Sequence, residues 1–247
     1  MIADIISVID ANLAIASAVA VVAGLIHGFA GFGVGLVLVP SLAILLGPVE
    51  AVAIAGIASI AATAQLIPGA VRIMDRRLIW PILIPTPFAV IAGTHLLVVI
   101  DPQIMQRSMG ALVFALGLVL LFGFRRRARS SIGAGLSVGL LGGFLGGSTS
   151  MGGPIFTTYI LSSEAGARSM RGGILVVTTT VSVFTVAALA ASGDIQLETV
   201  IRSIVIFFPN ALGIWAGAKL FGKSADTTYR RVALALLLII GVAAMIA

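Results

Sequence analysis

The sequence contains no cysteine and very little charge, and each absence excludes a class of protein. Without cysteine there is neither a disulfide framework nor thiol chemistry. Charged residues make up 10% of the 247-residue chain, against about 25% in a typical soluble domain. The chain is 60% hydrophobic, with a mean hydropathy of +1.19. Apolar stretches follow one another almost without a break, which is typical of helical membrane proteins that cross the bilayer several times.

Acidic residues are absent from the interiors of these apolar stretches. All nine lie near predicted segment ends: Asp4, Asp10, Glu50, Asp75, Asp101, Glu164, Asp194, Glu198 and Asp226. A cation-driven or proton-driven pump usually keeps a carboxylate in mid-membrane. The sequence also shows no metal-ligand cluster, no Ser-His-Asp set and no P-loop, so we expect no enzyme activity, no cofactor and no ATP-driven transport by this chain alone.

The N-terminus lacks the basic region of a cleavable signal, because Asp4 and Asp10 stand there instead. We therefore expect residues 1–247 to form a single transmembrane domain. The net charge of +6 fits cytoplasmic loops of a membrane protein. No nucleic-acid partner is expected, because no aromatic and basic surface is present to bind one.

Two apolar stretches are too long for one membrane crossing. Residues 11–46 and 132–163 would each form a helix of roughly 50 Å, against a hydrocarbon core about 30 Å thick. The first contains a glycine cluster, Gly28-Phe-Ala-Gly31-Phe-Gly33-Val-Gly35, and the second a longer one from Gly142 to Pro154. Glycine and proline both disfavour helix interiors. Splitting each stretch at its cluster predicts ten segments, with one broken or re-entrant pair in each half of the chain.

An internal repeat supports this division. The segment beginning at Gly24, Gly-Leu-Ile-His-Gly-Phe-Ala-Gly, matches the one beginning at Gly139 at five of eight positions. Residues 85–112 match residues 209–236 at seven of 28 positions without a gap, including Pro85 with Pro209. We predict repeat one over residues 1–124 and repeat two over residues 132–247, joined by a basic cytoplasmic loop at 125–131. Because each repeat has five segments, the second is inverted relative to the first.

The distribution of arginine and lysine gives the orientation. With ten segments and an outside N-terminus, 13 of the 15 basic residues lie in inner loops and only Arg107 and Arg202 in outer ones. An eight-segment arrangement with an inside N-terminus places eight inside and seven outside. The ten-segment arrangement therefore fits better, and it puts both termini on the outside.

Helices that begin within the membrane create a site for an anion. Their first N–H groups have no helical partner, and the positive end of the helix dipole points the same way. We expect such helices to start near Gly33–Gly35 and near Met151–Pro154, where proline suits a first turn. The predicted substrate-binding residues are Gly31, Phe32, Gly33, Gly35, Ser148, Thr149, Ser150, Met151, Gly152 and Gly153.

Further polar residues are secondary candidates for the same site. They are His27, Ser59, Thr63, Thr178, Thr179 and Asn210. For the serines and threonines, close helix packing is the competing interpretation. His27 precedes the first break and could relay protons or form a packing hydrogen bond. Asn210 follows Pro209 and could cap a kinked helix or touch substrate.

On these residues the chain resembles the sulfite exporter TauE/SafE family, within the toluene-sulfonate uptake permease group. The matching features are the glycine-rich break followed by an apolar run and Pro40, and its variant ending at Gly153-Pro154. The Gly93 and Gly217 helices, each followed by an arginine in the next helix, also fit. The resemblance covers nearly the whole chain. It implies transport of sulfite, organosulfonates or related sulfur-containing anions across a bacterial inner membrane.

The sequence thus predicts an all-α integral membrane transporter that exports a small sulfur-containing anion by alternating access around a midplane site. A proton-coupled importer or antiporter of another small anion and a non-transporting membrane scaffold subunit are the alternatives. The expected partners are a small anionic substrate and the lipid bilayer. A homodimer is compatible with the sequence.

Overall fold

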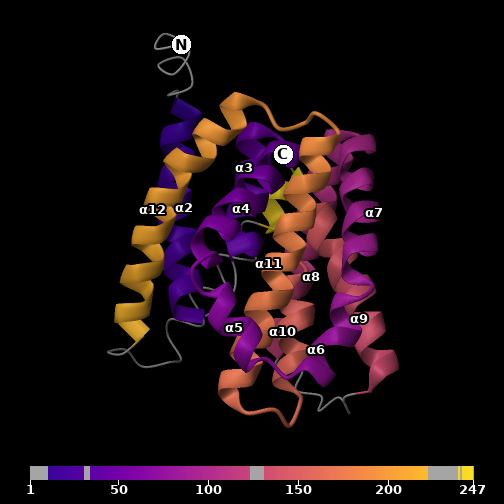
Figure 1. Ribbon diagram of the computed structural model, residues 1–247. Helices are drawn as coiled ribbons and strands as arrows, with labels where there is room; N and C mark the ends of the chain where they lie inside the picture. The colour runs from indigo at the N-terminus through magenta and orange to yellow at the C-terminus, as the bar shows by residue number, and fades with distance from the viewer. Residues whose placement is uncertain (1–10, 31–33, 123–130, 222–238, 240, 247) are drawn as a thin grey trace. The chain divides into compact units, whose positions relative to one another are not determined.

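The computed structural model describes residues 11–30, 34–122, 131–221, 239 and 241–246 (Figure 1). Within these ranges every regular element is a helix, which confirms the predicted all-α fold for the described residues. The helices are α2 (Ala11–Ala30), α3 (Val34–Leu46), α4 (Pro48–Thr63), α5 (Ile67–Ile73), α6 (Arg76–Leu83), α7 (Thr86–Val99), α8 (Pro102–Phe122), α9 (Ile132–Thr149), α10 (Gly153–Leu161), α11 (Ala167–Ala191) and α12 (Leu197–Phe221).

Several of these helices are long and apolar enough to cross a membrane. Four spans pass this test in the described residues: Arg76–Val99, Ile132–Thr149, Arg168–Ala191 and Leu197–Ala216. The bent pair α4–α5 makes a fifth. Leu13–Leu25 and Gly35–Leu46 are shorter apolar helices. The chain is therefore a multi-pass helical membrane protein, as its hydropathy predicts.

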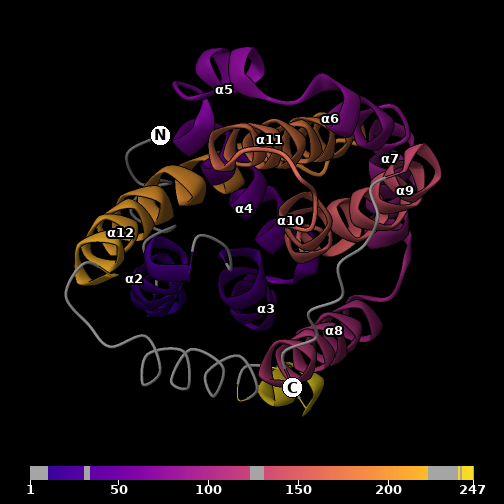
Figure 2. The same cartoon turned by 90° about the horizontal axis from the view of Figure 1, so that it is seen from below.

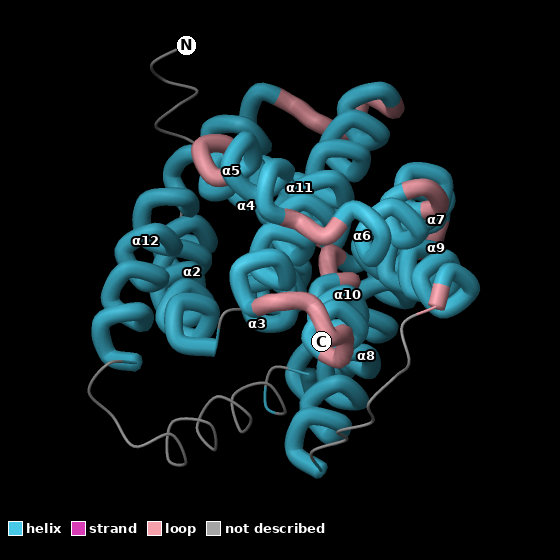
Figure 3. The backbone as a smooth tube through the Cα atoms, turned by 60° about the horizontal axis from the view of Figure 1, so that its bottom comes forward, coloured by secondary structure: helices cyan, strands magenta, loops and turns pink. Residues whose placement is uncertain are grey.

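Local sequence explains where the helices begin and turn. The Asp75 carboxylate accepts hydrogen bonds from the N–H groups of Arg77 and Leu78, and so caps α6. Asp101 caps α8 and Ser131 caps α9 in the same way. Short loops connect the helices (Figure 3). Two of them turn at glycines with positive φ, Gly47 at 89° and Gly193 at 82°.

The apolar stretch at residues 50–71 does not form one straight helix. α4 and α5 are bent by 73° at a break of three residues, 64–66. Pro68, near the start of α5, has no N–H to continue the hydrogen bonds of α4. The hydropathy pattern does not predict this break.

The chain forms two compact units that do not coincide with its two halves. The first unit comprises Met1–Ala58, Ile100–Phe124 and Asp194–Ala247. Within it, α2 packs along α12, and α3 contacts both α2 and α8 (Figure 2). A helix of the second half, α12, thus lies against the first described helix of the first half, α2.

The second unit comprises Ser59–Val99 and Arg125–Gly193. Within it, α9 packs along α7 and α6, and α11 contacts α5, α7 and α10 (Figure 2). Here a helix of the first half, α7, lies against the first helix of the second half. Both units therefore combine elements from the two halves of the chain.

Candidate functional site

The chain reverses direction between α9 and α10, at the place where the sequence predicts the second break. Ser150 ends α9 in the left-handed conformation, with φ 58° and ψ 15°, and its N–H donates to the Gly146 carbonyl at 2.9 Å. The chain then returns along α9, because the Tyr159 hydroxyl on α10 donates to the Ser131 carbonyl at 3.0 Å. α9 and α10 thus form a helical hairpin with one long and one short arm.

A stripe of glycines on one face of α9 packs against α6 and α7. A Cβ atom at Gly139 would lie 2.3 Å from the carbonyl oxygen of Ile82, and one at Gly147 would lie 2.3 Å from that of Val90. Gly135 and Gly143 belong to the same stripe, four residues apart from their neighbours. These glycines lie inside α9 and serve close helix packing. The break itself comes after them, at residues 150–152.

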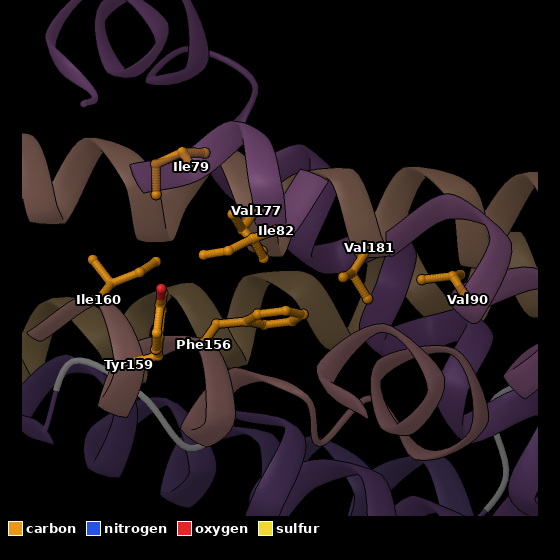
Figure 4. Close-up of a cluster of buried hydrophobic side chains, with 8 residues drawn as sticks. All are labelled: Ile79, Ile82, Val90, Phe156, Tyr159, Ile160, Val177 and Val181. Atoms are coloured by element: carbon orange, nitrogen blue, oxygen red, sulfur yellow. The ribbon is translucent and has the colours of Figure 1, made fainter. Parts of the chain in front are cut away.

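The opposite glycines of α9 face the returning arm and α11. Gly142 lies against the ring of Phe156, and Gly146 against the side chain of Val181. Phe156 and Val181 belong to a buried apolar cluster with Ile79, Ile82, Val90, Tyr159, Ile160 and Val177 (Figure 4). This cluster fixes the short arm of the hairpin against α11, and so fixes where α10 begins.

The first turn of α10 presents unpaired N–H groups. Within the described residues, the amides of Gly152 and Gly153 donate no hydrogen bond, and Pro154 has no N–H. Gly152 is enclosed, because a Cβ atom there would lie 2.1 Å from the Gly142 carbonyl oxygen. Gly153 is different, since nothing lies within 4 Å of the position its Cβ would take. The start of α10 therefore combines free donors with open space.

This helix start lies halfway along the unit. Gly152 packs between Gly142 and Gly146 of α9, and the neighbouring Gly143 packs against Thr86 and Ala89 of α7. Residues 86–89 are the middle of the Arg76–Val99 span. The N-terminus of α10 thus lies at mid-span in the second unit. There an unscreened helix dipole and free amides favour an anion.

Two of the three hydroxyl groups at the end of α9 already donate hydrogen bonds, unlike the amides of Gly152 and Gly153. Ser148 and Thr149 are buried and donate to the carbonyls of Phe144 and Leu145, at 2.8 and 2.7 Å. The Thr149 oxygen also accepts from the N–H of Met151, a fully buried residue. Ser148 and Thr149 therefore stabilise the turn in this conformation. The hydroxyl of Ser150 donates to no described group.

The secondary candidates on α4 and α11 meet in the second unit. The Thr179 hydroxyl donates to the Thr63 hydroxyl at 2.9 Å, and Thr63 donates to the Ser59 carbonyl at 2.8 Å. Thr178 instead donates to the Ile174 carbonyl of its own helix. The structure thus brings together Ser59, Thr63 and Thr179, and leaves Thr178 hydrogen-bonded within α11.

Asn210 joins two helices of the first unit. Its buried side-chain amide donates to the Ala20 carbonyl of α2 at 3.1 Å. Beside it, a Cβ atom at Gly24 would lie 2.3 Å from the Asn210 carbonyl oxygen. This contact is a packing hydrogen bond between α2 and α12.

The predicted first break can be placed only in part. Gly31, Phe32 and Gly33 lie outside the described residues, and so does the side chain of His27, which falls within α2. Gly35 is the second residue of α3, close to the predicted helix start. His95 is exposed and lines a mostly apolar groove of about 520 Å³ between α7 and α11.

The structure contains an ion pair that the sequence analysis does not predict. Arg202 lies in α12, where it pairs with Glu50 of α4 and with Glu198 one turn earlier. The hydropathy pattern assigns Arg202 to an outer loop and Glu50 to a segment end. Their pairing across 152 residues has no local sequence signal.

Several polar residues of the second unit line a pocket near Ser131 and Tyr159, at the end of the α9–α10 hairpin opposite its turn. Its volume is about 410 Å³, and its lining includes Asp75, Arg77, Ser131, Tyr159 and Glu164. No group of three or more His, Cys, Asp or Glu side chains that could hold a metal occurs in the described ranges.

The fold and the site together define a class. Several apolar helices and a helix that starts at mid-span are features that recur in membrane transporters. The family model of the sulfite exporter TauE/SafE matches residues 16–244, nearly the whole chain. The chain belongs to this family, which confirms the predicted resemblance and makes it a transporter rather than an enzyme. Comparisons with curated proteins and with solved structures gave no match.

Proposed function

We propose that the protein exports a small sulfur-containing anion, such as sulfite or an organosulfonate, by alternating access around a site at the start of α10. The family supports this class of substrate. The observation that carries the site is the pair of free amides at Gly152 and Gly153, beside open space at mid-span. Two N–H groups and a helix dipole suit the oxygens of a sulfite or sulfonate group.

The proposed roles of the hairpin residues follow from their hydrogen bonds. The amides of Gly152 and Gly153 and the free hydroxyl of Ser150 would contact the anion. Ser148, Thr149 and Met151 would hold the turn in shape, because their polar groups are already paired or their side chains buried. Gly31, Phe32, Gly33 and Gly35 would supply the matching half of the site, on the evidence of sequence alone.

The two halves of the chain exchange helices, and the exchanged helices make similar contacts. This similarity supports a second half-site that corresponds to the one at the start of α10. Gly24 packs against the Asn210 carbonyl and Gly213, and Gly143 packs against the Thr86 carbonyl and Ala89. Asn210 and Gly213 are the repeat partners of Thr86 and Ala89 in the alignment of 85–112 with 209–236. By their contacts, Gly24 therefore corresponds to Gly143 in the repeat. The sequence alignment instead matches Gly24 with Gly139, one helical turn earlier in α9. With that register, Gly33 corresponds to Gly152.

The charge of the substrate and of the chain supports the proposed direction and orientation. Export of a monoanion from a cell at −100 mV is favoured by about 2.3 kcal/mol, so efflux can run without a coupled ion. The distribution of arginine and lysine supports both termini outside and the loop at 125–131 in the cytoplasm, and the family supports a bacterial inner membrane as the location.

Proton-coupled import or antiport is the second candidate, with His27 as carrier. It predicts that flux rises as one side is acidified and that His27→Gln abolishes this dependence. Unchanged pH dependence in His27→Gln would remove His27 from the mechanism. Family membership argues against a scaffold without transport activity.

Flux of sulfite and of small organosulfonates in proteoliposomes tests the proposal. Gly153→Ala would place a methyl group in the open space at the α10 start without clashing with any described atom. We expect it to raise the KM for the anion at least tenfold while the protein stays folded. Gly133→Ala is the matched control, because its new methyl also meets nothing within 4 Å but lies at the far end of α9. Equal kinetics in the two variants would refute the site.

A further inference from the structure

The break between α4 and α5 leaves backbone carbonyl groups without partners. Leu66 donates its N–H to the Thr63 carbonyl instead of to Ala62, and Pro68 has no N–H to offer Ala64. The N–H of Gln65, which would ordinarily reach Ala61, makes no hydrogen bond with a described group. Three carbonyl oxygens near the end of α4, those of Ala61, Ala62 and Ala64, are therefore unpaired in the described structure.

These carbonyls lie at mid-span. Thr63 is hydrogen-bonded to Thr179, which is the twelfth residue of the 24-residue span Arg168–Ala191. Irregular backbone with free polar groups does not occur against lipid at this depth, and is tolerated only where it is buried in protein or lines a water-filled cavity. Ala61, Ala62 and Ala64 are all exposed residues, so this stretch of irregular backbone lies at an open surface of the described structure.

Side-chain oxygens add to the carbonyls. Thr179 and Thr63 form a chain of hydroxyl groups that ends on the Ser59 carbonyl. The side chains of Ser59 and Gln65 make no hydrogen bond to any described group. Neutral oxygen atoms of α4, of the turn and of α11 thus lie at the break or next to it along the chain of hydrogen bonds, all within the second compact unit.

The chemical type of these oxygen atoms indicates which ligand they suit. The last carbonyls of a helix carry its negative partial charge, which attracts cations. Oxygen donors without nitrogen or sulfur suit hard metal ions, and divalent ions generally require carboxylates as well. The described cluster contains neither a carboxylate nor an imidazole. Unwound backbone carbonyls and helix C-termini are the groups with which transporters coordinate Na⁺.

We propose that the α4–α5 break is a binding site for an alkali-metal cation, with Na⁺ as its principal ligand. The carbonyls of α4 and the hydroxyls of Thr63 and Thr179 supply the ligands. Antiport through this site, with Na⁺ entering as the anion leaves, would add an inward Na⁺ gradient to the membrane potential as a driving force for export. This coupling rests on the proposed function, whereas cation binding itself does not require the anion site at α10.

Binding of ²²Na⁺ to the purified protein in detergent, with chloride as the only anion and no sulfite or sulfonate present, tests the proposal directly. We expect saturable binding, and a rise in Tm when NaCl replaces choline chloride at constant ionic strength. Thr179→Val keeps the side-chain shape but removes the hydroxyl, and should weaken Na⁺ binding at least tenfold. Thr180→Val is the matched control, because the Thr180 hydroxyl donates only to Val176 of its own helix.

Should Thr179→Val fail to fold, Gln65→Leu provides a second variant at an exposed position. It removes the unpaired amide oxygen beside these carbonyls and should also weaken Na⁺ binding. Absence of saturable ²²Na⁺ binding by the wild-type protein would overturn the proposal, as would equal binding by Thr179→Val and Thr180→Val. Sulfite flux that is unaffected by Na⁺, together with absent binding, would remove the cation site and leave anion transport intact. Conversely, Na⁺ binding retained by Gly153→Ala would show that the two sites are separate.

Discussion

The Nη1 atom of Arg202 donates to both carboxylate oxygens of Glu50, at 2.9 and 3.0 Å. The two side chains are largely buried, at 14% and 20% exposure, and they join α12 to the first turn of α4. Glu198 contacts the same guanidinium from one turn earlier in α12 but is 46% exposed. The ion pair therefore connects segments of the first unit that are far apart in the sequence.

Removing the Glu50 charge should destabilise the first unit. Glu50→Gln leaves the buried guanidinium without its main partner, and we expect a loss of about 1–3 kcal/mol. Glu198→Gln should cost less than about 1 kcal/mol, because that pair is more exposed. Thermal unfolding in detergent measures both. Equal losses in the two variants would mean that burial does not govern the strength of these pairs.

The glycine stripe of α9 should tolerate no side chain. Gly147→Ala would drive a methyl group against the Val90 carbonyl and should destabilise the protein by at least about 2 kcal/mol. Gly133→Ala, with free space around it, should be neutral or stabilising by up to about 1 kcal/mol because alanine favours helix. Comparison of the two Tm values checks this. A harmless Gly147→Ala would show that α7 and α9 are further apart than the contact implies.

Substitutions of Ser150 distinguish the effect of its strained backbone on stability from the effect of its hydroxyl on substrate binding. Its left-handed conformation favours glycine, so Ser150→Gly should stabilise the turn by about 1 kcal/mol, whereas Ser150→Ala should not. Both variants lose the hydroxyl. If that hydroxyl contacts the anion, KM for sulfite rises in both; an unchanged KM in both would exclude it from the site.

Asn210 should matter for packing and not for substrate. Asn210→Leu removes the hydrogen bond to the Ala20 carbonyl and should cost about 0.5–2 kcal/mol, with KM for sulfite unchanged. Ser203→Ala is a suitable control, since buried Ser203 donates only within its own helix. A raised KM in Asn210→Leu at unchanged stability would place Asn210 among the substrate contacts.

Sequence alone predicts the helical membrane fold, because hydropathy reports it directly, and it predicts the start of α10 to within two residues. The register of the repeat is less clear from sequence. Gly24 matches Gly139 in the better-scoring alignment, at five of eight positions, whereas the contacts of Gly24 correspond to those of Gly143. Glycine recurs every four residues through Gly139, Gly143 and Gly147, so the spacing of the packing glycines fits either register.

The break between α4 and α5 shows a second limit. Its signals, Gln65 and Pro68-Gly69, lie within an apolar stretch of ordinary length, which gives no reason to divide it. The pairing of Glu50 with Arg202 and that of Thr63 with Thr179 depend on which helices become neighbours. Local sequence does not encode that choice.

The exchange of helices between the halves sets an order of assembly during synthesis. α2 leaves the ribosome about 170 residues before its partner α12, which at 5–20 residues per second is a wait of roughly 10 to 30 s. The second unit is complete at Gly193, before α12 exists. During that interval the face of α2 around Ala20 and Gly24 has no partner. The nascent chain therefore passes through a stage in which one unit is assembled and the other depends on temporary cover from lipid or from the insertion machinery.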